Sequence, residues 1–284
     1  MRLSIDHHTI YRFSVPQGRL TQMLRLTPED TDDQTVTAWD LHVDCDARLR
    51  PGRDGFGNKV TMLYVAGPID SIEIAVSGEV LTNSADGVVH GAHEVLPPAL
   101  FLRATPLTLA TAAIADFTAA AVSAGTDLVG RLHRLNLALN ARFVADRDRP
   151  VTGRTAAQAF ALDRATPRDM AHVFIAAART LGVPARYVSG YSRFAFGGEH
   201  RPAPHGWAEA YVAGLGWVAF DPSAGRSADE AYVRVAVALD AAGAAAVAGS
   251  RLGEGDEEMD VDVTVAPASD RARAGPALTP GRLP

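Results

Sequence analysis

Two ionisable side chains in the second half of the chain could together form a general base. His205 begins the alternating run HGWAEAYVAG, and Asp221 ends the alternating run GWVAFD. Alternation of this kind predicts strands, and the short linker between the runs would place the two strands side by side and antiparallel. An aspartate that accepts a hydrogen bond from one imidazole nitrogen orients the ring and leaves the other nitrogen to act as a base. Spacing alone nevertheless favours an ordinary histidine and an aspartate that opens a turn before Pro222.

A base of this kind normally serves a nucleophile at the start of a helix, where the helix dipole stabilises a thiolate. The stretch ALDRATPRDMAHVFIAA predicts such a helix, with an apolar face and an end near Gly182. At its front stand Thr166, Pro167, Arg168 and Asp169, and no cysteine. Thr166 suits the N-cap, Pro167 the first helical position and Asp169 the third, so the helix has a good start but carries no thiol.

The elements around these residues change character along the chain. Runs within the first ninety or so residues alternate between apolar and polar side chains and are separated by turn signals, which predicts an antiparallel sheet or sandwich. The middle of the chain has helical periodicity, with an apolar stripe after an N-cap candidate at Thr126 or Asp127. Strand-like runs follow from about Ala185. Helices followed by a set of strands indicate an α+β arrangement.

These changes divide the chain into an N-terminal β domain at 1–95 and a core at 100–265. The Ala- and Gly-rich tract at 239–258 is expected to be a loop, and the alternating run MDVDVTV after it is expected to be a strand that closes the core. Residues 266–284 are rich in Pro, Gly and Ala, so a disordered tail is predicted there.

Composition limits the classes of function that the chain can have. The 284 residues carry a formal net charge of −6 and 47% hydrophobic residues, without a basic stripe or a long apolar run. We therefore expect neither nucleic-acid binding nor a membrane span. Cys45 is the single cysteine of the sequence, which excludes an intramolecular disulfide. The alternating start of the chain does not resemble a signal peptide, and a cytoplasmic protein is expected.

Longer stretches of the chain resemble the bacterial transglutaminase-like family, which is related to papain-like cysteine proteases. The stretch YRFSVPQGRLTQMLRLTPEDTDDQTVTAWDLHVD, with DGFGNKV after it, resembles the family's N-terminal β domain. The stretches TAAQAFALDRATPRDMAHVFIAAARTLGVPARYVSGY and HGWAEAYVAGLGWVAFDPSAG resemble its catalytic core. The resemblance covers nearly the whole chain. It implies an α+β fold, in which an antiparallel β domain precedes a papain-like transglutaminase core of helices packed on an antiparallel sheet.

The same resemblance assigns positions in a Cys-His-Asp triad. In the family, a Gly-Val-Cys-Gln-Asp run precedes Ala-His on the central helix, and its cysteine is the nucleophile. Here the run reads ATPRD, so that Ala165 replaces the glycine, Pro167 falls at the cysteine position and Arg168 replaces the glutamine. His205 and Asp221 match the other two members of the triad. The resemblance therefore implies a degenerate triad, because proline has no nucleophilic group.

Three functions fit this combination of residues. The first is a pseudoenzyme that binds a peptide or protein partner in the former cleft, without acyl transfer. The second is a peptidase or amidohydrolase in which His205 and Asp221 activate water or Thr166. The third is a non-catalytic subunit of a complex with an active relative.

Further side chains are candidates for the cleft of such a protein. Arg168 at the cleft floor could bind a carboxylate, or it could pair with Asp169 or Glu209. Aromatic residues are expected in the core or the cleft wall, among them Tyr187, Tyr191 and Trp207.

The remaining polar residues have simpler expected roles. Thr166 is expected to cap the helix, and His172 to make a buried structural hydrogen bond. Cys45 is expected to be an inert thiol. No cofactor is implied, and the loop GGEHRPAPH lacks the rigid ligand spacing of a metal site.

Overall fold

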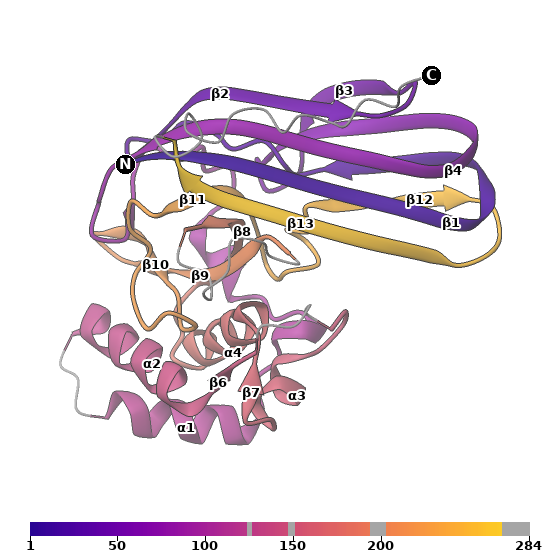
Figure 1. The fold of residues 1–284 in the computed structure, drawn as a ribbon. Coiled ribbons are helices and arrows are strands. Elements are labelled where there is room, and N and C mark those ends of the chain that lie inside the picture. The colour runs from indigo at the N-terminus through magenta and orange to yellow at the C-terminus, as the bar shows by residue number, and fades with distance from the viewer. Residues whose placement is uncertain (124–126, 147–150, 194–202, 269–284) are drawn as a thin grey trace.

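The computed structural model describes residues 1–123, 127–146, 151–193 and 203–268, which form three layers (Figure 1). A long antiparallel sheet is the first layer, and a smaller antiparallel sheet is the second. Helices form the third layer, on the side of the smaller sheet away from the long one. This arrangement confirms the predicted α+β class, with an antiparallel β region followed by helices on a second antiparallel sheet.

The larger sheet is built around two long neighbouring strands. Its members are β1 (Arg2–Leu24), β2 (Gln34–Val43), β3 (Arg48–Arg53), β4 (Lys59–Thr82), β12 (Val247–Leu252) and β13 (Glu257–Pro267). β13 and β12 pair with successive parts of β1, and β2 and β3 pair with different parts of β4. Over much of their length, side chains of β1 and β4 alternate between buried and more exposed positions, as the alternating sequence predicts.

The smaller sheet positions the predicted functional residues. Its hydrogen-bonded order is β11-β8-β9-β10-β5, and all of its pairings are antiparallel. Its members are β5 (Val88–Val89), β8 (Ala185–Ser192), β9 (His205–Val212), β10 (Gly216–Phe220) and β11 (Tyr232–Ala238). Every residue of β8 is buried, because the larger sheet and the helices cover its two faces. A short parallel pair, β6 (Val144–Ala145) and β7 (Arg164–Ala165), lies near the helices.

One helix is central to the helical layer. The helices are α1 (Ala112–Val122), α2 (Leu128–Arg142), α3 (Ala156–Phe160) and α4 (Pro167–Thr180), with 3-10 turns η1 (Pro98–Leu102) and η2 (Pro106–Thr108). α4 contacts β8 and β9 on one side and the other three α-helices elsewhere. Residues 169–178 are therefore all buried, whereas the sequence predicts a single apolar face.

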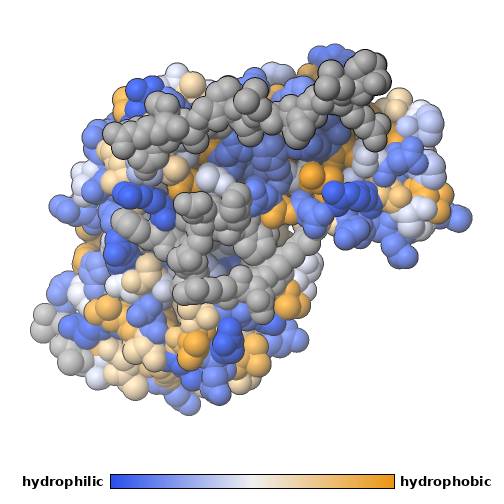
Figure 2. Space-filling model, in the orientation of Figure 1, coloured by the Kyte–Doolittle hydropathy of each residue, from blue (hydrophilic) through white to orange (hydrophobic). Residues whose placement is uncertain are grey.

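The N-cap of α2 and the surface of the helical layer are two further features of this layer. Asp127 caps α2 by accepting from the Gly130 N–H, while the alternative N-cap candidate Thr126 lies outside the described residues. On the face that Figure 2 shows, hydrophilic and hydrophobic residues are interspersed over the helices, as is usual for a surface in contact with water.

The strand pairings cross the domain boundaries that the sequence predicts. The tract at 239–258 is expected to be a loop, yet it contains β12, which pairs with β1. β13 is expected to close the core, but it also pairs with β1. Both strands satisfy backbone N–H and C=O groups along one edge of β1, which would otherwise lack partners.

Two other segments also depart from the predicted boundaries. β5 belongs to the predicted N-terminal domain by sequence, but it joins the smaller sheet. Of the predicted tail, residues 266 and 267 complete β13, and 269–284 lie outside the described residues.

A buried ion network ties the strands of the smaller sheet together. Arg186 on β8 donates to Glu209 on β9 at 2.7 Å. Its two terminal nitrogens form a bidentate ion pair with the two carboxylate oxygens of Glu94, each at 2.7 Å. Arg234 on β11 donates to Glu209 at 2.8 Å. The Arg186 guanidinium lies 3.8 Å from the centroid of the Trp217 ring. Burial disfavours the charged form of Glu209, but the two arginines outweigh burial and hold the pKa of its carboxyl below the usual value.

Removing the charge of Glu209 should destabilise the fold. We expect Glu209→Gln to lower the free energy of unfolding by about 3 kcal/mol, because buried arginines lose their counter-charge. Since the folded pKa of Glu209 is lowered, its contribution is present above its unfolded pKa of about 4.3 and is lost as the pH falls through the folded value. Urea denaturation of the variant and the wild type, at pH 7 and at pH 3, measures the difference.

Glu79→Gln is the matched control for this prediction. Glu79 pairs with Arg2 at the surface, where the two side chains are 28% and 58% exposed. Such exposed pairs contribute less than about 1 kcal/mol. Equal losses in the two variants would show that the buried network does not stabilise the fold.

Candidate functional site

His205 and Asp221 meet at one end of the smaller sheet. His205 is the first residue of β9, and Asp221 directly follows β10, the antiparallel neighbour of β9. The turn at 213–215 joins the two strands, so the start of one strand lies near the end of the other. His205 Nε2 and Asp221 Oδ2 are 2.7 Å apart, and both side chains are buried. The structure thus brings together the two residues that the sequence predicts as a pair.

Hydrogen bonds from four residues hold the Asp221 carboxylate. Oδ2 accepts from His205 and from the Tyr232 hydroxyl, the latter at 2.8 Å, and Oδ1 accepts from the Ser223 hydroxyl at 2.6 Å. The backbone N–H groups of Ser223 and Ala224 donate to Oδ1 at 2.9 and 3.3 Å. Burial disfavours the charged carboxylate, but His205 and the hydroxyl donors outweigh burial and lower the pKa of Asp221. Asp221 is therefore an ionised and fixed partner for His205.

Aromatic neighbours also fix the His205 ring. The ring stacks on the indole of Trp207, two residues along β9, with centroids 6.0 Å apart and an interplanar angle of 25°. The Tyr232 ring lies on another side, with its centroid 5.8 Å from that of His205. Because Nε2 faces Asp221, Nδ1 is the nitrogen that could exchange a proton with a reacting group. The pair has the geometry of an oriented base.

Thr166 starts α4, and its hydroxyl is engaged in capping. The hydroxyl accepts from the Asp169 N–H at 3.3 Å and donates to Asp169 Oδ2 at 2.9 Å. Asp169 Oδ2 also accepts from the Thr166 N–H at 3.2 Å and from Arg154 Nη1 at 2.8 Å. This reciprocal capping box uses the hydroxyl proton as well as a lone pair. The structure shows the N-cap that the sequence predicts at Thr166.

Pro167 and Arg168 occupy the first two positions of α4. Pro167 is half-buried, and its ring has no proton or lone pair to offer a substrate. The Arg168 guanidinium lies near the Tyr187 hydroxyl on β8, and both residues line one cavity. Within the described part of the chain, no carboxylate forms an ion pair with Arg168. Asp169 and Glu209, its two expected partners, are paired with other arginines.

Comparison with known sequences identifies both parts of this fold. Residues 3–81 match the bacterial transglutaminase-like N-terminal region, and residues 115–222 match the transglutaminase-like superfamily. The second match includes the first turn of α4 together with His205 and Asp221. The chain belongs to the transglutaminase-like superfamily. Its α+β architecture is accordingly the papain-like fold that the sequence predicts.

Similar proteins align with most of this transglutaminase-like chain. An uncharacterized protein of Mycobacterium leprae (strain TN) is 26% identical over 289 aligned residues, covering 93% of this chain and 98% of that protein. The crystal structure of a "Putative Cysteine Protease from Cytophaga hutchinsonii" has a TM-score of 0.74 at 18% identity, covering 94% of this chain and 91% of that chain. The periplasmic domain of TgpA from Pseudomonas aeruginosa has a TM-score of 0.37 at 16% identity, covering 76% of this chain and 87% of that chain.

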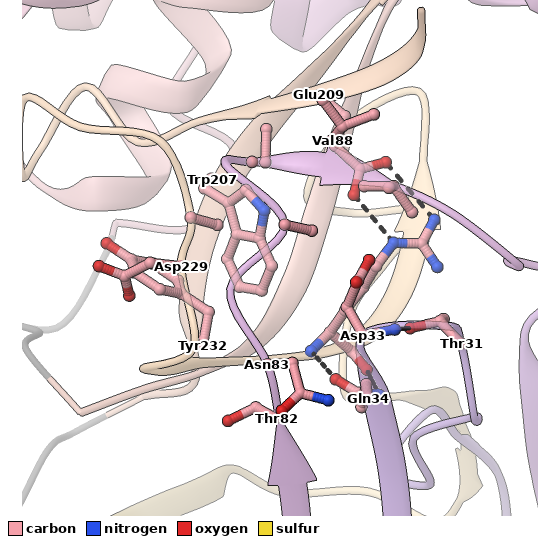
Figure 3. A pocket seen from close by; sticks show the side chains of 16 residues that line it. Thr31, Asp33, Gln34, Thr82, Asn83, Val88, Trp207, Glu209, Asp229 and Tyr232 are labelled. Atoms are coloured by element: carbon pink, nitrogen blue, oxygen red, sulfur yellow. Dashed lines mark hydrogen bonds and ion pairs between the residues drawn. The ribbon is translucent and has the colours of Figure 1, made fainter. Parts of the chain in front are cut away.

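The aromatic cleft candidates of this transglutaminase-like protein are packing residues in the structure. Trp207 lines a small cavity of about 70 Å³, where Trp207 and Tyr232 lie on one side and Gln34 on the other (Figure 3). Tyr191 is buried between the two sheets, with its hydroxyl 3.0 Å from His7 Nδ1 on β1. Trp207 therefore supports the His205 ring, and Tyr191 joins the sheets.

A second cavity lies beside the start of α4. It has a volume of about 360 Å³ and is enclosed by α4, β8, β13 and the segment before β12. The His205–Asp221 pair is not part of its described wall. Side chains of both sheets and of α4 form that wall, among them Arg168, His172, Tyr187, Met259 and Val261.

His172 in this cavity wall confirms the predicted buried hydrogen bond. Its Nε2 accepts from the Ala241 N–H at 3.0 Å, so Nδ1 carries the ring proton. Nδ1 faces the backbone carbonyl of Arg154 without the geometry of a hydrogen bond. Burial lowers the pKa of His172 to about 4, and the ring is therefore neutral at pH 7.

Sequence reasoning missed two of the residues that hold Asp221, namely Tyr232 and Ser223. Tyr232 comes from β11, and no spacing rule links it to the pair. Ser223 follows Asp221 by two residues, a separation typical of a side chain that closes its own turn, and this signal was available. Gly206 also carries information, because a Cβ there would come within 1.8 Å of the Tyr187 hydroxyl. A glycine inside a strand indicates such a close approach.

Other expectations about this transglutaminase-like chain stay predictions. None of the helices in the described ranges is long and apolar enough to cross a membrane. Among the described residues, no three His, Cys, Asp or Glu side chains cluster as metal ligands would. Most of the loop GGEHRPAPH lies outside those residues. The cytoplasmic location and the lack of nucleic-acid binding rest on the sequence alone.

The family resemblance, together with the oriented His205–Asp221 pair, predicts that His205 will activate a cysteine introduced at position 167. We expect Pro167→Cys with Ala165→Gly and Arg168→Gln, in a Cys45→Ser background, to react with iodoacetamide at pH 7 at least tenfold faster than an ordinary thiol. The imidazolium and the helix start would stabilise the thiolate. Mass spectrometry over time measures the labelling. Adding His205→Ala is the control, and equal rates with and without His205 would show that the pair is out of register.

The capping role of Thr166 predicts a loss of stability in Thr166→Ala. We expect the free energy of unfolding to fall by about 1 kcal/mol, because the Asp169 N–H loses its acceptor. Thermal or urea denaturation measures the change. Thr166→Ser keeps the hydroxyl and serves as the control. If serine destabilises as much as alanine, then packing of the threonine methyl group, and not capping, accounts for the loss.

Proposed function

We propose that this protein is a pseudoenzyme that binds a peptide or protein partner without acyl transfer. The observation that carries the proposal is the first turn of α4, where Pro167 takes the first helical position and capping occupies the Thr166 hydroxyl. The family resemblance puts the nucleophilic cysteine at Pro167. Without a thiol there, the site lacks the atom that would form an acyl intermediate.

The geometry of Thr166 argues against hydroxyl catalysis. A nucleophilic hydroxyl must give its proton to the base, whereas Thr166 donates to Asp169 Oδ2 at 2.9 Å. Turning the hydroxyl toward His205 would break the capping box, at a cost of about 1 kcal/mol. It would also leave Asp169, whose Oδ1 is buried without a partner, with one donor fewer.

The intact His205–Asp221 pair does not require a catalytic role. Both side chains are buried, and the ionised carboxylate depends on His205, Tyr232 and Ser223 for its hydrogen bonds. Losing one partner of a buried, hydrogen-bonded charge typically costs about 3–5 kcal/mol of stability. Folding alone therefore favours keeping the pair after the thiol is gone.

The cavity beside α4 supports the binding part of the proposal. Its volume of about 360 Å³ is within the range of pockets that hold small ligands or side chains. It lies next to the former nucleophile position, because Arg168 belongs to its wall. A partner could therefore occupy the region of the former cleft without contacting the buried His205–Asp221 pair.

A hydrolase that uses water is the second candidate function. The observation that favours it is the 2.7 Å hydrogen bond between His205 and Asp221, which leaves His205 Nδ1 as a base. A non-catalytic subunit of a complex is the third candidate function. Like the pseudoenzyme, it would not turn over a substrate. Its binding partner would be an active relative of this chain.

The pseudoenzyme proposal predicts no turnover that depends on His205. Wild type and His205→Ala should give the same background with an N-blocked glutaminyl-glycine peptide plus an amine, and with casein peptides, as followed by mass spectrometry. The reason is that neither protein has an activated nucleophile. Circular dichroism of the variant controls for loss of fold. Turnover by the wild type that falls at least tenfold in His205→Ala would contradict the pseudoenzyme and support the hydrolase.

A further inference from the structure

The described wall of the cavity beside α4 carries a positive charge that no described carboxylate balances. None of the described residues in its wall is an aspartate or glutamate, whereas Arg154 and Arg168 both belong to it. Arg154 is committed to Asp169, with an N–O distance of 2.8 Å. His7, also in the wall, uses both ring nitrogens in hydrogen bonds to neighbouring hydroxyls, at 3.0 and 3.1 Å. Arg168 is the arginine of the described wall that no described carboxylate neutralises.

Two neutral donors stand beside Arg168. The Tyr187 hydroxyl lies near the guanidinium, and burial raises the pKa of this hydroxyl so that it keeps its proton. His172 is one turn after Arg168 on the same helix face, and its Nδ1 proton has no hydrogen-bond partner among the described residues. The Tyr187 and His172 ring centroids are 5.4 Å apart. A guanidinium that no described carboxylate pairs with, beside a neutral hydroxyl, is suited to a carboxylate, which accepts several hydrogen bonds at once.

Another part of the cavity wall is apolar. β13 contributes Met259 and Val261, both half-buried, and the segment that leads into β12 contributes small side chains such as Ala246. The cavity therefore combines a cationic, hydrogen-bonding end with a surface for an aliphatic group. A ligand that matches both must carry a carboxylate close to an apolar side chain.

We propose that this cavity binds a peptide carboxylate, with Arg168 as the ion-pair partner and Met259 and Val261 against a neighbouring apolar side chain. The inference rests on the proposed function, because it names the chemistry by which a peptide partner is held. The carboxylate belongs either to the C-terminus of the peptide or to an aspartate or glutamate within it. The volume of about 360 Å³ suits a chain end or one side chain with its neighbour.

A randomised library of N-acetylated hexapeptides tests the proposal and identifies the source of the carboxylate. The library is prepared as C-terminal acids and as C-terminal amides, and the bound fraction is measured by equilibrium dialysis with mass spectrometry. A C-terminal site predicts enrichment among the acids alone. A side-chain site predicts enrichment in both forms of peptides with Asp or Glu beside an apolar residue. Each enriched peptide is then compared with its neutral amide or glutamine analogue.

Arg168→Gln should weaken binding of the enriched peptides at least tenfold and leave the weaker binding of the neutral analogues unchanged. Arg168→Lys should keep part of the affinity, because lysine keeps the positive charge but lacks the planar guanidinium that can donate two parallel hydrogen bonds to a carboxylate. Arg164→Gln is the matched control and should bind like the wild type. Arg164 is four residues earlier, its side chain is 62% exposed, and it is not in the described cavity wall.

The outcomes separate the two proposals. If the neutral analogues bind as tightly as the acids, or Arg168→Gln binds like the wild type, the carboxylate site is wrong while peptide binding stands. If no peptide of either library is enriched, peptide binding itself is contradicted, and the carboxylate site fails with it.

Discussion

The first turn of α4 must satisfy backbone N–H groups that have no partner within the helix. In this protein Thr166 caps the Asp169 N–H, the Asp169 carboxylate returns to the Thr166 N–H, and Pro167 has no N–H to satisfy. The turn is thereby fixed at the position to which the family resemblance assigns the nucleophile. Because α4 is enclosed by the smaller sheet and by other helices, the position of this turn also sets the position of Arg168 beside the cavity. Under the proposed function, helix capping occupies the position that thiol chemistry would need.

The neighbourhood of α4 holds two electrostatically different parts. In one part, the Asp221 carboxylate accepts hydrogen bonds from His205 and from hydroxyl and backbone donors. In the other, Arg168 faces a cavity whose described wall holds no acid. In the first part, burial makes each member of the His205–Asp221 pair depend on the other, so the proposed loss of a nucleophile would not remove the reason to keep the pair. In the second part, a half-buried cation that no described carboxylate pairs with favours a ligand of opposite charge, as proposed above.

The sequence predicted the parts of the fold and the site that depend on local pattern. Alternation placed His205 and Asp221 on neighbouring strands, and capping chemistry placed the start of α4 at Thr166. β12 was missed because an Ala- and Gly-rich tract has no alternation, and its strand conformation is imposed by the free edge of β1. The supporting role of Tyr232 was missed because it depends on a contact between strands that no spacing encodes. The sequence suggested a carboxylate partner for Arg168, and the structure adds that Asp169 and Glu209 are bound elsewhere.

The central claim is that this transglutaminase-like site no longer forms a covalent bond with its ligand. The mass of the intact protein, measured after incubation with an N-blocked glutaminyl-glycine peptide in the absence of an amine, tests it most directly. We expect an unchanged mass, because Pro167 has no nucleophile and the Thr166 hydroxyl is bound to Asp169. A mass increase equal to the acyl group, mapped by proteolysis to the first turn of α4, would contradict it.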